Sequence, residues 1–348
     1  MNRYLDALAV TDEHTFDDVN SQLLRLGLTD GLPIVPPVPA RVEAMLGGRD
    51  PNAVVGVLAP ARGQATLRRM ALCAVMAGCR PAYLPILIAA VKAISEPDFN
   101  LLGVQTTTGN VSVMLLVNGP IVKRAELNAE HNAFGPGNRA NATIGRALTL
   151  MLRNIGEAVP GKTDMSTMGQ PGKYIFCAAE NEAANPWEPL HVSRGFTADT
   201  STVTAFAASG IMEVVDSTST AGQGVLTTMA RSMTIAGTIG GAAFMGGGRP
   251  LVLLAPEHAA IVARSHSRAQ AQATLHELAR MPLSQLSPET AQHLLETEGE
   301  PSDPAGDVWV AAEPADILLA VVGGIGIKSA YVPNWGGGSK PITVAIEA

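Results

Sequence analysis

The sequence predicts an α/β protein made of pseudo-symmetric α/β units, with mixed sheets and glycine-rich loops that meet at a shared cleft. Of its 348 residues, 47% are hydrophobic and 16% are charged, which is enough apolar material for one large domain or two smaller ones. Residues 86–118 and residues 225–256 each combine a helix-like segment, a glycine-containing loop and a buried-type strand. We therefore expect a duplicated unit, with the glycine-rich stretch at 323–345 as a third, partial copy.

Three parts are expected along the chain. Residues 1–40 form an N-terminal helix and a proline-rich strap, residues 41–170 a first α/β unit, and residues 171–348 a second one. Thr15 can cap a helix over 16–26. The prolines between 33 and 39 then fix an extended path, because proline lacks a backbone donor and has a fixed φ. This strap either clasps the first helix onto the body or touches a substrate.

Composition excludes several classes of function. The formal net charge is −7 and the chain has no block of Lys and Arg, so a nucleic acid is a poor candidate for a partner. The first residues do not resemble a signal peptide, and no apolar run has the length of a membrane span, about 18 residues. The 3 cysteines contain no CxxC pair, which argues against a disulfide framework. We expect a cytoplasmic protein with reduced thiols.

Helices are predicted over 64–76 and 84–94, and the turn between them carries a candidate binding thiol. Cys79 follows a glycine and precedes Arg80 and a proline. A neighbouring cation can lower the pKa of a thiol, so Cys79 and Arg80 are candidates for substrate binding. Cys73 lies in an apolar helical run and is expected to be core.

A glycine-proline loop at 134–138 opens a helix that runs to about 154. Free backbone N–H groups and the positive end of the helix dipole favour an anion there. The alternative is an ordinary capped helix with solvated arginines. The candidate anion ligands are Arg139, Asn141, Thr143 and Arg146, and Gly145 would allow a close approach to the helix.

The glycine-rich loops do not form a nucleotide-binding motif. Neither GxxxxGK[ST] nor a GxGxxG that opens a βαβ unit is present. Lys328, after the apolar run 317–322, is a candidate to project from a strand end into a cleft, and a solvated lysine is the alternative. The cofactor is unknown, and a metal remains possible.

The segment 173–191 gathers most of the chemistry-bearing groups. A strand is predicted over 174–179, with Glu180 and Glu182 at its end, where α/β proteins place ligand-binding groups. Cys177 would face the other side of that strand, so a bend after 179 is needed to bring the thiol to the carboxylates. The alternative makes Cys177 a core residue and the acids surface groups. The candidate catalytic residues are Cys177, Glu180, Glu182 and His191.

Five motifs also carry a resemblance that spans about residues 30–345. They are DGLPIVPP, MAGCRP, GPGNRANATIGR, GKYIFCAAENE and PWEPLH. The chain resembles a largely uncharacterised bacterial family whose members are often encoded beside a small selenoprotein, or its cysteine homologue, with a UGSC motif. The resemblance implies a metabolic role with a thiol- or selenol-bearing protein as a possible partner.

These observations predict a cytoplasmic enzyme of small-molecule metabolism that acts on an anionic substrate. In the first hypothesis Cys177 is a thiolate, and Glu180 or Glu182 with His191 moves protons, as in a thiol-dependent transferase, lyase or reductase. The second is a metal-dependent lyase or hydratase in which His191 binds the metal together with Glu180, Glu182 or Cys177. The third is a non-catalytic subunit of a two-component system. Long apolar runs in the last third favour a homo-oligomer.

Overall fold

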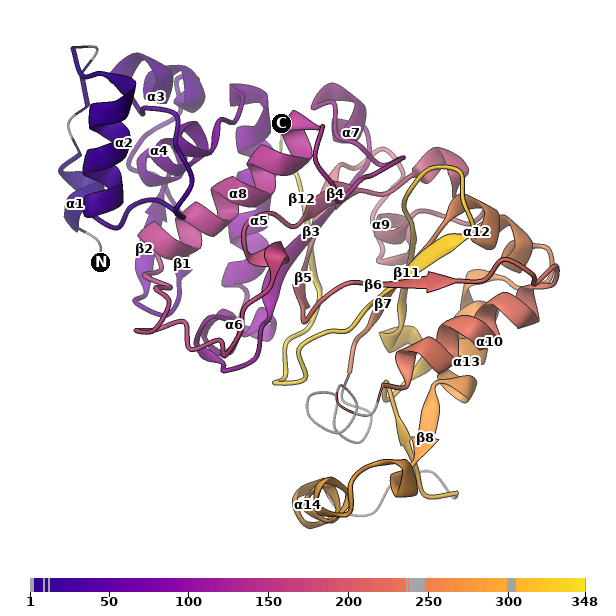
Figure 1. Cartoon of the computed structure of the whole chain (residues 1–348). Coiled ribbons are helices and arrows are strands. Elements are labelled where there is room, and N and C mark those ends of the chain that lie inside the picture. Colours follow the sequence, from indigo (N-terminus) through magenta and orange to yellow (C-terminus); the bar gives the residue numbers. More distant parts are fainter. Residues whose placement is uncertain are drawn as a thin grey trace.

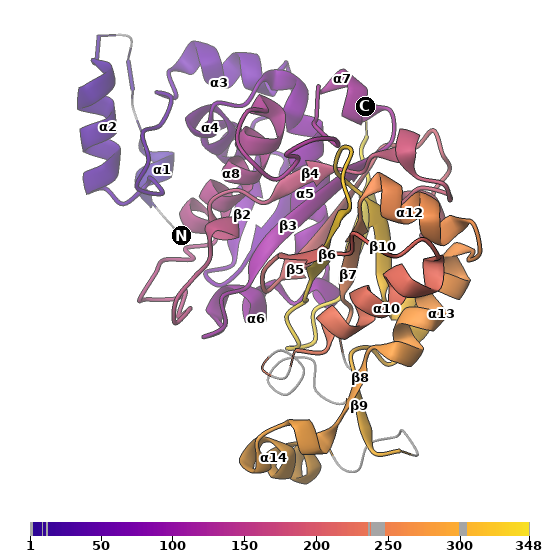
Figure 2. The ribbon, with the colours of Figure 1, turned by 45° about the vertical axis from the view of Figure 1, so that its right-hand side comes forward.

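The computed structural model describes residues 3–8, 10, 11, 13–235, 237, 248–298 and 305–347. It has four layers, in which two four-stranded sheets lie face to face between two groups of helices (Figures 1 and 2). The predicted mixed α/β class is confirmed. The first sheet has the order β12-β5-β3-β4 and the second β10-β7-β11-β6.

The strand bounds follow the apolar runs of the sequence. The first sheet contains β3 (Ser112–Asn118), β4 (Cys177–Ala179), β5 (Thr202–Ala208) and β12 (Ile342–Ala345). The second contains β6 (Met212–Val215), β7 (Leu251–Leu254), β10 (Leu318–Val321) and β11 (Lys328–Val332). Two short antiparallel pairs lie outside these sheets: β1 (Val54–Leu58) with β2 (Gly63–Thr66), and β8 (Arg280–Pro282) with β9 (Asp307–Trp309).

The helices in the first half of the chain are α1 (Arg3–Asp6), α2 (Phe16–Arg25), α3 (Pro39–Leu46), α4 (Leu67–Ala77), α5 (Leu84–Ser95), α6 (Leu101–Thr106), α7 (Ile121–Arg124) and α8 (Arg139–Asn154). The later helices are α9 (Leu190–Ser193), α10 (Gly222–Met233), α12 (Pro256–Ala263), α13 (Arg268–Leu278) and α14 (Pro288–Glu298). Helices α4, α5 and α8 share a core with the first sheet, and α10, α12 and α13 share one with the second.

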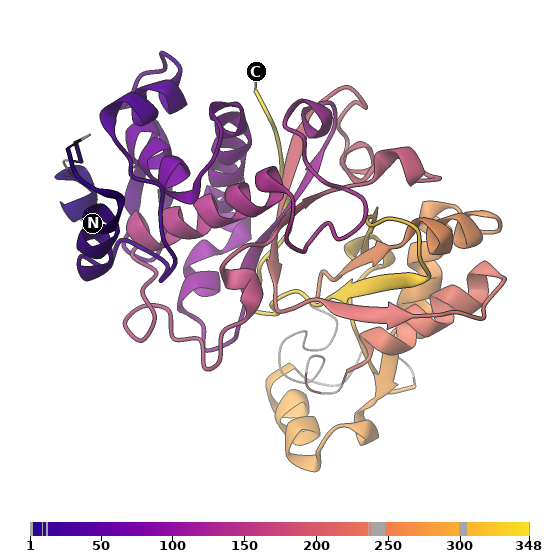
Figure 3. The same ribbon diagram turned by 45° about the horizontal axis from the view of Figure 1, so that its top comes forward.

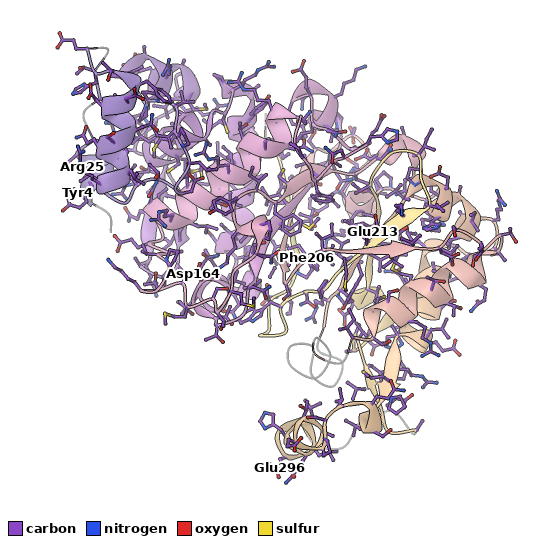
Figure 4. The ribbon with its side chains drawn as sticks, in the orientation of Figure 1. Tyr4, Arg25, Asp164, Phe206, Glu213 and Glu296 are labelled. Atoms are coloured by element: carbon purple, nitrogen blue, oxygen red, sulfur yellow. The ribbon has the colours of Figure 1, made fainter. Side chains whose placement is uncertain are left out.

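A separate apolar core joins the two sheets. Successive side chains of a strand point to opposite faces, so alternate residues of each strand pack inward between the sheets and the others pack against helices. Phe206 of β5 belongs to the inner layer and is labelled in Figure 4. The inner core also includes Met114, Leu116, Leu251, Leu253 and Leu318.

The two sheets repeat one topology. In the first sheet β4 and β3 are parallel, and in the second β10 and β7 are parallel. The third strand, β5 or β11, is antiparallel to β3 or β7. The fourth strand, β12 or β6, is antiparallel to the third. The succession β3, β4, β5 of the first sheet matches β7, β10, β11 of the second. The helices that precede these units, α5 and α10, match the sequence repeat predicted at 86–118 and 225–256. The pseudo-symmetry is therefore present in the backbone.

The fourth strands are exchanged between the sheets. After β5 the chain crosses to the second sheet, where β6 pairs with β11, and after β11 it returns, so that β12 pairs with β5. Figure 3 shows the yellow C-terminal segment running away from the yellow strand β11 toward the indigo and magenta half of the molecule. This exchange corrects two expectations. The stretch 323–345 is not a third copy, and residue 170 does not divide the sheets, because β4, β5 and β12 all lie in the first.

A serine cap occurs at the same place in both units. Ser201, just before β5, accepts a hydrogen bond from the Ile121 N–H at 3.0 Å, and Ser329 of β11 accepts one from the Ala255 N–H at 3.0 Å. Each N–H belongs to the chain just after β3 or β7. The shared cap supports a duplicated unit.

The glycine-rich loops meet each other, but an indole occupies the space between them. Gly103 and Gly337 lie so close to the ring of Trp335 that a Cβ on either would clash with it. These glycines therefore allow close packing rather than an open cleft. The loop at 240–247, which was also expected at this cleft, lies outside the described residues.

The N-terminal segment follows its prediction closely. Thr15 accepts a hydrogen bond from the Asp18 N–H and caps α2, as predicted. Beyond this segment, α5 matches the helix expected at 84–94. Helix α4 begins at Leu67 and not at residue 64, because residues 63–66 form β2. The proline-rich strap binds α8. Asn154 donates to the Leu28 carbonyl at 2.9 Å. This contact fastens the segment that leads into the strap onto α8, as the clasp interpretation expects.

The central contact of this clasp is the ion pair of Arg146 and Asp30. The Nε and Nη2 of Arg146 donate to the two carboxylate oxygens at 2.7 and 2.8 Å. Nη2 also donates to the Pro33 carbonyl at 2.9 Å. The side chains of Arg146 and Asp30 are 13% and 5% exposed. Arg146 therefore holds the strap, and its charge is already paired.

We predict that Arg146→Met lowers the free energy of unfolding by about 3 kcal/mol, because removing one partner leaves the other charge buried and unpaired. Denaturant titration measures this. Arg139→Met is the matched control on the same helix, and its exposed side chain should cost no more than about 0.5 kcal/mol. Equal losses in the two variants would contradict a bracing role for Arg146.

Candidate functional site

The first candidate place is the carboxyl end of β4, where Glu180 is 1% exposed. Its carboxylate accepts hydrogen bonds from Asn118 Nδ2 (2.6 Å), Leu190 N (2.8 Å), Asn185 Nδ2 (2.8 Å) and Val321 N (3.3 Å). Burial raises the pKa of Glu180, and these hydrogen bonds act in the opposite direction. The carboxylate ties the ends of β3, β4 and β10 together and touches no open space, so its contacts are those of a structural tie.

Glu182 and His191 lie beside this tie. Glu182 Oε1 accepts from Asn118 Nδ2 at 2.9 Å and from Gly119 N at 2.7 Å, and it lies 3.8 Å from His191 Nδ1. Neither ring nitrogen of His191 has a hydrogen-bond partner among the described residues, and the residue is fully buried. The expected grouping of Glu180, Glu182 and His191 is therefore real. A dissolved substrate can reach only Glu182, whose side chain is 28% exposed.

Within the described ranges, no three His, Cys, Asp or Glu side chains are arranged to hold a metal ion. This argues against the set His191, Glu180, Glu182 and Cys177 as metal ligands.

The thiol of Cys177 lies on the opposite face of β4. Cys177 and Ala179 belong to the core shared with α8, whereas Ala178 faces the second sheet. No bend brings the thiol to the carboxylates. Cys177 is 2% exposed, and burial raises the pKa of its thiol, as does the nearby Cys79. This environment favours the core alternative over the thiolate.

The expectation of a lowered pKa at Cys79 is wrong. Burial raises the pKa of Cys79 to about 12 and outweighs the opposing effects of a hydrogen bond to Thr143 and the charge of Arg139. The Cys79 Sγ donates to the Thr143 carbonyl at 3.2 Å. The guanidinium of Arg80 is not a partner of this thiol, because its Nη1 pairs with Glu126 Oε2 at 2.7 Å on the surface.

The start of α8 binds the chain itself rather than presenting an anion site. Arg139 donates to the Gly78 carbonyl at 2.9 and 3.1 Å, and Thr143 donates to the Arg139 carbonyl at 2.8 Å. Asn141 is 2% exposed and holds the backbone of Asn128 and Ala133 through three hydrogen bonds. The side chains of Arg139, Asn141 and Thr143 thus bind different parts of the chain, and Arg146 binds Asp30. The four side chains do not meet at one place where a ligand could bind.

Two further expectations are corrected by packing. Gly145 allows the chain before β4 to approach α8, because a Cβ there would lie 2.9 Å from the Phe176 nitrogen. No space for a ligand is involved. Lys328 begins β11 with a 56% exposed side chain and lies 3.6 Å from Glu213, labelled in Figure 4. It is a surface lysine and not part of a cleft.

A cavity of about 600 Å³ lies at the other end of β3. The second half of α8, the start of β3 and the loop 158–174 enclose it, and its volume is within the range of small-molecule sites. Val113, the lining residue of β3 nearest to Asn118, precedes it by five positions, which is about 17 Å at the rise of a strand. Its apolar lining consists of Val111, Val113, Leu148, Leu152, Ala158, Pro160, Met168, Pro171 and Tyr174.

An ion pair stands in the cavity wall. Lys173 Nζ lies 2.8 and 2.6 Å from the two carboxylate oxygens of Asp164. Their side chains are 25% and 16% exposed, and Asp164 also accepts the Ser166 N–H at 3.1 Å. Figure 4 labels Asp164 on its loop beside the first sheet, away from the second. An amine and a carboxylate in contact, beside a mainly apolar space, can give or take a proton.

Arg153 supplies the remaining charge of the cavity. Its Nε donates to the Gly27 carbonyl at 3.2 Å, and its two terminal nitrogens have no hydrogen-bond partner in the part of the chain that the structure describes. Sequence reasoning missed Arg153, although it follows Arg146 by seven residues and such a spacing places both on one helix face. It also left out Asp164, for which the sequence offers no signal except the nearby lysine.

A smaller cavity of about 270 Å³ lies between α9 and α13. Arg268 lines it, but its guanidinium donates to the Glu188 carboxylate, the Glu188 carbonyl and the Leu319 carbonyl. Arg194 also lines it and donates to the Thr343 hydroxyl and the Pro341 carbonyl. Both cations therefore already bind the chain itself, and the volume is less than half that of the first cavity, so the larger cavity is the stronger candidate.

Labelling of the thiols tests the first hypothesis. We predict that iodoacetamide near neutral pH modifies none of Cys73, Cys79 and Cys177 in the folded protein, because all 3 are buried and burial raises each thiol pKa. All of them should react after denaturation, which peptide mass spectrometry will show. Rapid modification of Cys177 in the native protein would revive the thiolate mechanism.

No family model, curated protein or solved structure matches this chain. No helix among the described residues is long and apolar enough to cross a membrane.

Proposed function

We propose that this protein is an enzyme of small-molecule metabolism whose substrate enters the cavity beside α8, with Lys173 and Asp164 as its proton-transfer groups. The observation that carries the proposal is the contact of Lys173 Nζ with both oxygens of Asp164, at 2.8 and 2.6 Å, in the wall of a cavity of about 600 Å³.

The chemistry follows from the pair and its surroundings. The pair holds one transferable proton between an amine and a carboxylate. A bound substrate can accept that proton from Lys173 or give one up to the pair, which is general acid–base catalysis. The mainly apolar lining screens the charges less than bulk water does and so strengthens their interaction with a substrate. This mechanism replaces the thiolate of Cys177, whose burial does not favour it.

Substrate turnover tests the proposal. Wild-type protein is incubated with a defined panel of small carboxylic acids and their amides, and mass spectrometry follows the loss of each compound. We predict that Lys173→Met reduces turnover at least 100-fold, the lower range for loss of an acid–base group. Asp164→Asn should have a similar effect. Lys328→Met is the matched control, because that lysine also faces a glutamate but lies on the surface.

The same variants separate catalysis from loop anchoring. If Lys173 and Asp164 serve only to anchor the loop 158–174, their substitution will lower the melting temperature and leave turnover per folded molecule unchanged. That result, or a wild-type protein that converts no compound of the panel, would refute the proposal.

A second candidate function is favoured by the burial of all 3 cysteines. Since this chain presents no thiol at its surface, a thiol- or selenol-dependent reaction would need a partner to supply that group, with this chain as the binding subunit. We predict in that case a stable complex with the UGSC-type protein, detected by co-purification of the two chains. Separate elution at micromolar concentration would exclude it.

The proposal keeps the cytoplasmic setting expected from the sequence. The homo-oligomer also stays a prediction, which sedimentation at micromolar concentration decides.

A further inference from the structure

We infer that the ligand of the cavity is a carboxylate monoanion with an apolar body, and that Arg153 binds its carboxylate. The inference rests on the proposed function in one respect, that the cavity is a ligand site, and it does not require Lys173 to transfer a proton.

The charges around the cavity give the net charge of the ligand. Four lining residues are charged: Asp30, Arg153, Asp164 and Lys173. Both oxygens of Asp30 accept hydrogen bonds from Arg146, and both oxygens of Asp164 contact Lys173. Among these lining groups, all within the described residues, Arg153 alone lacks a carboxylate partner. One positive charge is left for a ligand to neutralise.

The orientation of Arg153 suits a planar anion. Its Nε is fixed on the Gly27 carbonyl at 3.2 Å, so the side chain is held while the two terminal nitrogens remain available. A guanidinium with free terminal N–H groups binds a carboxylate in a bidentate, charge-assisted manner. Because one end of the arginine is already anchored, less side-chain entropy is lost when a ligand binds.

The rest of the lining selects against other anions. A phosphate monoester carries close to two charges at neutral pH, and the second cation of the cavity, Lys173, is already paired with Asp164. Nine apolar side chains line the cavity, so a ligand with an apolar body buries more apolar surface there than a sugar acid would. The hydroxyl groups of a sugar acid would need partners among Gln105, Ser112, Thr149, Ser166 and Gln170, and a polar group buried without a hydrogen bond costs about 1–3 kcal/mol. An aliphatic or aromatic carboxylate meets both conditions.

Matched acids and amides test the inference by calorimetry. The probes are hexanoate with hexanamide, 3-phenylpropanoate with 3-phenylpropanamide, and phenyl phosphate as the dianion. We expect the wild-type protein to bind each acid at least tenfold more tightly than its amide. Arg153→Met should remove this preference, and Arg153→Lys should keep part of it because the charge remains.

Arg139→Met is the control. Arg139 lies on the same helix and also donates to a backbone carbonyl, that of Gly78, so its loss matches the structural part of the Arg153 substitution. This control should bind the acids as the wild type does. A melting curve for each variant shows that the fold is intact.

Three outcomes would overturn the inference. The first is equal binding of acid and amide by the wild type, or no binding of either acid at millimolar concentration. The second is an acid preference that survives in Arg153→Met. The third is tighter binding of phenyl phosphate than of both carboxylates. Turnover by the wild type separates the two proposals: if the wild type prefers the acids, Arg153→Met loses that preference and no compound of the panel is converted, the ligand class stands and the proposed enzyme falls.

Discussion

The exchange of β6 and β12 between the two sheets is the constraint on which the rest of the structure depends. Each sheet obtains its fourth strand from a segment that follows the other sheet in the chain. The sheets are therefore tied by backbone hydrogen bonds at their edges as well as by the apolar core between their faces. Glu180 adds a third connection, since its carboxylate joins the end of β3 to the end of β10. Two duplicated units become a single body in this way.

Helix α8 is the second organising element. One of its faces packs on β4, where Gly145 allows the close approach, and another holds the N-terminal strap through Arg146. Arg153, two turns further along, extends from the strap to the cavity. The strap and the cavity are thus linked by one helix, and Asp30 belongs to both. This arrangement explains why the motif around 135–146 serves structure even though its composition resembles an anion site.

Much of the fold could be predicted from local sequence signals. Thr15 marks the start of α2, the apolar run after 84 gives α5, and the similarity of 86–118 to 225–256 reflects a true repeat of topology. The alternation of side chains along β4 also places Cys177 and Glu180 on opposite faces, as the period of a strand requires. These features depend on residues close together in the chain.

The features that sequence reasoning missed depend on distant partners. The carbonyl of Gly78 occupies Arg139, and the carboxylate of Asp30 occupies Arg146. Neither partner is visible from the helix that carries the arginine. The strand exchange has the same origin, since pairing of Ala205 with Ile342 leaves no local signal. The cavity was missed because the irregular loop at 158–174 brings Asp164 to Lys173.

The strand exchange also has a consequence for synthesis on the ribosome. A chain that emerges from its amino end can form α5, β3, β4 and β5 early, but the edge of β5 stays open until Ile342–Ala345 have left the tunnel. An unpaired strand edge is a template for pairing with other chains, and contacts between distant segments form slowly. The nascent first sheet is therefore open to aggregation at this edge, and pairing of β12 with β5 ends that exposure.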